Sequence, residues 1–179
     1  MEATGFQSAN AIPGWQTTAS AGTYNPPARL VPLEAPHGGN VAWVNVTGVL
    51  RQTLETTFQP NTTYQLTVEI GSLQGFEFPG YEVGLFAGGK VVVANTGLSA
   101  PAIAGRFSTV NASAWIPGDS SSVGQPIEIR LGIPGVGAGQ VDFDWVRLSA
   151  VTVPEPASVA LLAGGAVTLL LICGRGRRK

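Results

Sequence analysis

The stretch Tyr64-Gln65-Leu66-Thr67-Val68-Glu69-Ile70 decides the fold of this chain. Its apolar and polar residues alternate, which is typical of a β-strand with one face in a core and the other turned away from it. The turn residues Gln59-Pro60-Asn61-Thr62 come just before this run and start the strand. A run of this kind predicts a sheet that packs against a second layer.

Similar runs occur on both sides of this stretch, at spacings near ten residues. They cover residues 41–46, 49–54, 81–85, 91–94, 106–115, 127–133 and 141–148. In the last run the apolar parity changes from Val141 and Phe143 to Val146 and Leu148, which predicts a β-bulge near Trp145. Short strands without a helical period predict an all-β fold, a jelly-roll β-sandwich over residues 3–149.

Composition limits the function classes. The 179 residues suffice for one domain with a real core, and only 12% of them are charged. Residues 1–155 contain six basic and eleven acidic residues, a net charge of about −5. A nucleic-acid-binding domain carries a basic surface, so we expect no nucleic-acid partner.

The C-terminal tail differs from the body. Residues 157–173 contain no charge and would reach roughly 25 Å as a helix, which predicts a single transmembrane helix. Residues 150–156 form the predicted linker, and residues 174–179 form a basic tail. The cations of this tail favour the cytoplasmic side and place the body outside the membrane. They are Arg175, Arg177, Arg178 and Lys179.

A motif, Pro154-Glu155-Pro156, precedes this helix. Together with the helix and the basic end, it resembles the PEP-CTERM sorting signal of Gram-negative bacteria that make exopolysaccharide. The resemblance implies an exosortase-type processing partner, cleavage near Pro154-Glu155-Pro156, and a cell-envelope or matrix location. Such proteins begin with a secretory signal peptide, whereas Met1-Glu2-Ala3-Thr4-Gly5-Phe6 has no basic or apolar leader. We therefore expect the given sequence to lack its true start.

The body shows a second resemblance. Gly5-Phe6-Gln7, Pro13-Gly14-Trp15, residues 58–68 and residues 141–148 occur in the order seen in galactose-binding-like carbohydrate-binding modules. Members of that group often hold a structural calcium between the first and last strands. The resemblance implies that Asp144 and Gln7 would occupy the ligand positions, with Gln7 replacing the usual glutamate. No other cofactor is expected.

One loop carries candidate ligand-binding residues. Sugars stack on aromatic rings while their hydroxyls bond to polar groups. Residues 75–81 combine aromatic side chains with a carboxylate between glycine and proline residues, and so predict a glycan-binding loop. Its candidate contacts are Phe76, Glu77, Phe78 and Tyr81.

Enzymatic chemistry finds weaker support in the sequence. Asp142 and Asp144 share one strand face about 6–7 Å apart, a spacing open to glycoside hydrolysis but common in strands. His37 is the single histidine and has no second ligand for a zinc site or a triad. The sequence therefore predicts a non-enzymatic exported surface or matrix protein that binds glycan. A structural envelope protein without a ligand, or a glycan-active hydrolase, are the alternatives.

Overall fold

The computed structural model describes residues 7–8, 12–18, 20–29, 31, 35–98, 104–135 and 138–152. Within these ranges the regular structure consists of strands. They are β1 (Gln7–Ser8), β2 (Gln16–Thr17), β3 (Ala21–Tyr24), β4 (Val41–Asn45), β5 (Val49–Thr57), β6 (Thr62–Ser72), β7 (Tyr81–Ala87), β8 (Lys90–Gly97), β9 (Arg106–Ile116), β10 (Pro126–Gly132) and β11 (Gln140–Thr152).

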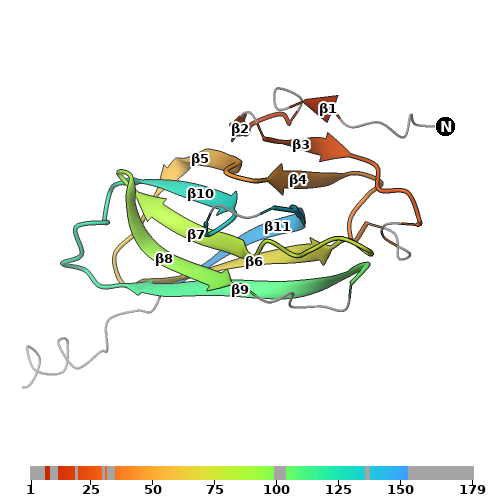
Figure 1. The fold of residues 1–179 in the computed structure, drawn as a ribbon. Coiled ribbons are helices and arrows are strands. Elements are labelled where there is room, and N and C mark those ends of the chain that lie inside the picture. Colours follow the sequence, from red (N-terminus) through yellow and green to blue (C-terminus); the bar gives the residue numbers. More distant parts are fainter. Residues whose placement is uncertain are drawn as a thin grey trace, which may run out of the picture.

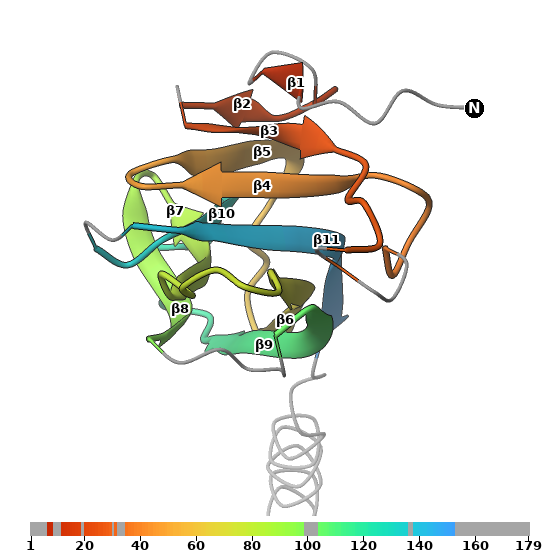
Figure 2. The ribbon, with the colours of Figure 1, turned by 45° about the vertical axis from the view of Figure 1, so that its right-hand side comes forward.

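The strands form two sheets that pack face to face (Figure 1). The first sheet has the order β1-β3-β4-β11-β6-β9, and the second has the order β2-β5-β10-β7-β8. Neighbouring strands are antiparallel in both sheets. In Figure 2, β11 crosses the first sheet beside β4. The prediction of an all-β sandwich is confirmed.

The core lies between the two sheets. On the first sheet, Leu66, Val68, Ile70 and Phe143 face inward and are fully buried, and Val83, Leu85, Ile127 and Leu131 face them from the second sheet. Each side chain of this size stabilises the fold by about 1.5–3 kcal/mol when it leaves water. The even-numbered residues from Tyr64 to Ile70 are therefore the ones that face the core, as the alternation in the sequence predicted.

The predicted bulge near Trp145 is confirmed. The register of β11 against β6 shifts between Asp144 and Arg147, and Trp145 has a φ of 47°. Before the bulge, Val141 and Phe143 point into the core, whereas after it Val146 and Leu148 pack against the core. The bulge thus reverses which parity of β11 faces inward.

The C-terminal end of the sandwich differs from the predicted boundary. β11 continues to Thr152, and its last three residues pair with residues 62–64, so the predicted linker 150–156 begins inside a strand. The alternation of β11 gave no signal for this extension. The predicted transmembrane helix 157–173 and basic tail 174–179 lie outside the described residues. In the described part, no helix has the length and apolar character needed to cross a membrane.

Candidate functional site

Asp142 lies at the centre of the candidate site. On β11 the side chains of Gln140, Asp142 and Asp144 share the face of the first sheet that points away from the core, because Val141 and Phe143 point into it. Asp142 is nevertheless 0% exposed. A carboxyl group in such a place needs hydrogen-bond partners.

Two side chains supply these bonds. The hydroxyl of Tyr24, on β3, donates to Asp142 Oδ2 at 2.6 Å. Gln140 Nε2 donates to Asp142 Oδ1 at 2.7 Å. Tyr24 and Gln140 are themselves buried, so the three side chains form a closed polar cluster inside apolar surroundings. We call it the Asp142 cluster.

A glycine makes room for the apolar wall of this cluster. Gly71 pairs with Asp142 across β6 and β11, and Phe107 pairs with Gly71 across β6 and β9. A Cβ atom on Gly71 would lie 2.7 Å from Phe107 Cε1 and 3.1 Å from Asp142 Cβ. The Phe107 ring therefore lies across the bare backbone of Gly71 beside Asp142 and helps to keep water from it.

This burial controls the protonation of the cluster. Burial raises the pKa of Asp142 to about 7, although the hydrogen bonds from Tyr24 and Gln140 oppose the rise. Burial, and then the nearby charge of Asp142, also raise the pKa of Tyr24 well above its ordinary value. A large fraction of Asp142 is therefore neutral near pH 7 and holds a proton that it can donate.

The raised pKa of Asp142 predicts a pH effect on stability. The folded state holds the proton up to about pH 7, whereas the unfolded chain releases it near the ordinary aspartate pKa of 3.8. The contribution of Asp142 to the free energy of unfolding therefore falls between these two pH values, by up to about 4 kcal/mol. Denaturant unfolding at pH 5 and pH 8 checks this, with Asp142→Asn as control. We expect the variant to lose less stability over this interval than the original protein, and equal losses would contradict the assignment.

An apolar pocket lies next to the cluster. Its volume is about 370 Å³, and Gln140 belongs both to its wall and to the Asp142 cluster. The pocket is lined by Asn45, Val46, Leu73, Phe76, Ala138, Gly139 and Gln140. Asn45 pairs with Gln140 across β4 and β11, and its amide nitrogen, turned toward its acceptors, donates to Gly139 O at 3.2 Å. We call this the Gln140 pocket; its size and lining suit a small, largely apolar ligand.

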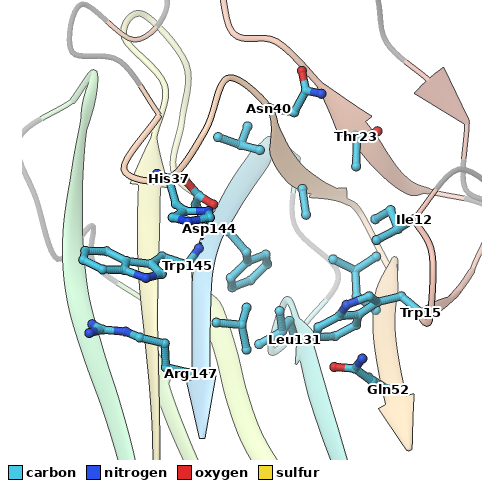
Figure 3. A pocket seen from close by; sticks show the side chains of 15 residues that line it. Ile12, Trp15, Thr23, His37, Asn40, Gln52, Leu131, Asp144, Trp145 and Arg147 are labelled. Carbon is cyan, nitrogen blue, oxygen red and sulfur yellow. Dashed lines mark hydrogen bonds between the residues drawn. The ribbon is translucent and has the colours of Figure 1, made fainter.

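A second cavity, of about 550 Å³, lies near the point where β4 no longer pairs with β11 (Figure 3). Core side chains from both sheets, including Leu131 and Phe143, form its inner wall, and Trp15 covers one side. Asp144, His37 and Arg147 also line it. We call it the Trp15 cavity.

The carboxyl group of Asp144 is occupied by backbone donors. It accepts hydrogen bonds from His37 N at 2.8 Å and from Trp145 N at 2.7 Å. Burial raises the pKa of Asp144, and these two bonds oppose the rise. The His37 ring stacks on Trp145 at 6.2 Å between centroids, and the Arg147 guanidinium carbon lies 4.1 Å from the centroid of the Trp145 ring. Asp144 thus holds the loop around His37 against β11.

The predicted glycan-binding residues are not brought together. Phe76 is 57% exposed and lines the Gln140 pocket, while Glu77 is exposed and does not line it. Phe78 packs against the core, with its ring 6.4 Å from that of Tyr81. Tyr81 is buried and donates to Asn95 Oδ1 at 3.2 Å. Of the four, Phe76 alone lies at the candidate site.

The predicted calcium ligands do not meet either. Gln7 lies on β1, and β3 and β4 separate this strand from Asp144 on β11, so the two backbones are about 14 Å apart. Ligands of one calcium ion lie within about 2.6 Å of it. Within the described ranges, no group of three or more His, Cys, Asp or Glu side chains is placed to hold a metal ion. The strands that carry Gln7 and Asp144 are thus separated by two others, and the role of this pair as calcium ligands stays a prediction.

Three features of the site were not foreseen. Tyr24 and Gln140 were not predicted to contact Asp142, and the burial of Asp142 was not predicted either. The available signal was the position of Asp142 between Val141 and Phe143, in a strand with few charges. The predicted sorting residues Pro154, Glu155 and Pro156, and the predicted topology residues in 175–179, lie outside the described residues.

Comparison with known proteins identifies relatives of this chain. A family model described as HpiC1-like, HpiC1 cyclase, matches residues 1–149. A Stig cyclase, Fisc, from Fischerella sp. TAU in complex with (3Z)-3-(1-methyl-2-pyrrolidinylidene)-3H-indole is 31% identical, with a TM-score of 0.74 over 86% of this chain and 92% of that chain. A cyclase from Fischerella sp. TAU in complex with 4-(1H-indol-3-yl)butan-2-one is also 31% identical, with a TM-score of 0.73 over 84% and 91%. No curated protein matches.

The likeness to carbohydrate-binding modules extends to the fold alone. The CBM22-2 xylan-binding domain from Paenibacillus barcinonensis is 10% identical, with a TM-score of 0.51 over 83% of this chain and 100% of that chain. A sandwich of this kind serves many unrelated functions, so the shared architecture does not carry sugar binding with it.

These comparisons correct the interpretation of the sequence. The identity predicted for the chain, an exosortase substrate with a carbohydrate-binding body, is wrong, because residues 1–149 match a cyclase family. The prediction of a non-enzymatic matrix or structural envelope protein is overturned by the same match. Exosortase, membrane and glycan partners find no support, since the relatives are complexes with small indole compounds. The predicted identity rested on the motif of the C-terminal tail, whereas the family match covers residues 1–149 of the body. From its match over residues 1–149 and its 31% identity with structures that it covers almost completely, the chain belongs to the HpiC1-like cyclase family.

Proposed function

We propose that this protein is a cyclase that closes a ring in an indole-bearing small molecule, with Asp142 as the proton donor. The family and the two indole complexes of its relatives support the reaction class and the kind of substrate. The observation that carries the proposal is the buried Asp142 carboxyl, whose pKa of about 7 leaves about half of it protonated at neutral pH.

Ring closure of this kind begins with a proton. Asp142 transfers its proton to one carbon of a double bond in the substrate, and the other carbon of that bond becomes cationic. A π-bond elsewhere in the same molecule then attacks the cationic carbon. The ring bond forms from that π electron pair, and the cyclised cation then returns a proton to the Asp142 carboxylate. Tyr24 holds Oδ2 of Asp142 throughout, because its own hydroxyl stays protonated.

The Gln140 pocket supports the placement of the substrate. Its wall is mostly apolar, Phe76 offers an aromatic face, and Gln140 connects it to Asp142. Exclusion of water by such a wall protects a cationic intermediate from hydration. We therefore place the indole ring against Phe76, with the reacting carbon toward Gln140 and Asp142.

A binding measurement tests this placement. Isothermal titration with 4-(1H-indol-3-yl)butan-2-one is expected to show one site, and Phe76→Ala is expected to weaken its Kd about tenfold, since loss of an aromatic contact costs about 1.4 kcal/mol. Trp115→Ala is a matched control, because Phe76 and Trp115 are both 57% exposed but Trp115 is not part of the pocket lining. No binding, or equal losses in the two variants, would reject the placement.

A further inference from the structure

Val46 lies in the turn between β4 and β5 and also lines the Gln140 pocket. Its φ of 52° lies in the left-handed region, which a β-branched residue rarely adopts. We propose that Val46 is a specificity-determining residue, whose side chain limits the size of the group that an indole ligand carries beyond its reacting carbon. This inference rests on the proposed function, because it concerns the pocket in which the substrate is placed.

Neighbouring segments fix the backbone of this turn. Asn45 N donates to Ser20 O at 2.8 Å, and Gly48 N donates to Asn45 O at 2.8 Å. A Cβ atom on Gly48 would overlap Ser20 O, so the end of the turn packs directly against the residue before β3. Of the two central residues of the turn, only Val46 has a positive φ, which is the pattern of a type II′ turn. Glycine is the usual residue at this position, because it has no side chain to strain the backbone.

Neither the turn nor the core accounts for a valine at this position. A valine with this φ strains the backbone, whereas glycine adopts it without strain. The Val46 side chain is 44% exposed, and among the residues that the structure describes it belongs neither to the core nor to the side chains packed against the core. Instead, Val46 forms part of the wall of the Gln140 pocket. The strained position and the pocket wall therefore coincide in one residue.

The strand order puts Val46 and Phe76 on opposite sides of Gln140. β11 runs between β4 and β6, and two strand spacings separate the backbones of β4 and β6 by about 10 Å. On the β4 side, Gln140 is paired with Asn45, and Val46 comes next in the chain. On the β6 side, Leu73 and Phe76 follow the end of the strand. An indole ring against Phe76, with its reacting carbon toward Gln140, therefore turns the group beyond that carbon toward Val46.

Contacts between three loops hold the two sides of the pocket at a fixed separation. The amide nitrogen of Asn45, turned toward its acceptors, donates to Gly139 O at 3.2 Å. A Cβ atom on Gly139 would lie 2.5 Å from Glu77 O, so Gly139 packs against the loop that carries Phe76. A ligand therefore cannot push the turn of Val46 away from that loop without breaking these contacts. Because the wall does not give way, a change of a few carbon atoms at Val46 changes which ligand fits.

Binding of two indole ketones tests the size limit. The probes are 4-(1H-indol-3-yl)butan-2-one and its analogue with an isopropyl group in place of the terminal methyl group, and isothermal titration gives the ratio of their Kd values. We expect Val46→Ala to shift this ratio by about threefold to tenfold in favour of the isopropyl ketone, and Val46→Ile to shift it similarly in favour of the methyl ketone. A ratio unchanged in both variants would overturn the proposal, as would the failure of both ketones to bind the original protein.

A third variant separates backbone strain from the fit of the ligand. Val46→Gly removes the strain and the side chain together, so we expect the Tm to rise by about 2–4 °C while the Kd ratio shifts toward the isopropyl ketone. Asn61→Gly is the matched control, because Asn61 has a φ of 51° at the other end of β6 and does not line the pocket. We expect it to leave the Kd ratio unchanged. A lower Tm in Val46→Gly would show that the valine serves the fold and would refute the specificity role.

The outcomes separate this inference from the proposed function. A size preference that changes with residue 46, in a protein that shows no ring closure, would leave the specificity role in place and reject the cyclase proposal. Ring closure that depends on Asp142, together with a Kd ratio that is indifferent to Val46, would do the reverse.

Discussion

Replacing Asp142 by asparagine is expected to lower the rate of ring closure by about 100-fold to 10,000-fold, the range typical of removing a positioned general acid. Asparagine has nearly the same shape and keeps an oxygen for the Tyr24 hydroxyl, but it has no acidic proton to transfer. The measurement is conversion of 3-substituted indoles with an alkenyl side chain, with products separated by liquid chromatography and identified by mass.

Asp144→Asn is the matched control for this prediction. Asp144 is two residues further along β11, on the same face, but its two oxygens bond to the backbone N–H groups of His37 and Trp145. We expect Asp144→Asn to retain activity within a few-fold. A loss in Asp144→Asn equal to that in Asp142→Asn would move the proton donor to the other carboxyl and refute our assignment.

Replacing Phe58 by alanine is expected to reduce the free energy of unfolding by about 3–5 kcal/mol, as for other fully buried phenylalanines. Phe58 is 0% exposed, and its ring meets the edge of the Tyr64 ring at 5.0 Å between centroids. Truncation removes this contact and leaves a cavity between the sheets. Urea unfolding measures the change, with the slope of the transition expected to stay constant.

The control for Phe58 is another aromatic residue. Trp115 is 57% exposed on β9, and Trp115→Ala is expected to change the free energy of unfolding by less than about 0.5 kcal/mol. A loss of under 1 kcal/mol in Phe58→Ala would show that the end of the sandwich near Phe58 is loosely packed, contrary to the burial seen here.

The fold was largely predictable because each strand carries its own signal. The alternation from Tyr64 to Ile70 and the change of parity at Trp145 are local, and both survive in the structure. β2 and β3 were missed because two-residue and four-residue strands are too short to show alternation. The extension of β11 through Thr152 depends on pairing with β6, which no local pattern encodes.

The site was less predictable because its parts come from separate strands. Tyr24 is 118 residues from Asp142 in sequence, and the glycine that admits the Phe107 ring beside Asp142 gives no chemical signal. An aspartate in an alternating strand is usually exposed to solvent. The burial of Asp142 becomes visible only in the three-dimensional structure, where side chains from other strands cover it. The aromatic loop drew attention because its residues are adjacent, yet only Phe76 reaches the Gln140 pocket.

The bulge at Trp145 divides β11 into two parts that turn opposite parities of their side chains toward the core. Ahead of it, even-numbered positions carry the polar groups of the Asp142 cluster; beyond it, even-numbered positions such as Val146 and Leu148 support the core. Substitutions at the even-numbered positions before the bulge can therefore change the polar groups of the Asp142 cluster, while Val146 and Leu148 remain packed against the core. Loss or gain of a single residue at the bulge would instead shift one part of β11 by one position. This shift would turn either its carboxylates into the interior or its aliphatic side chains out of it.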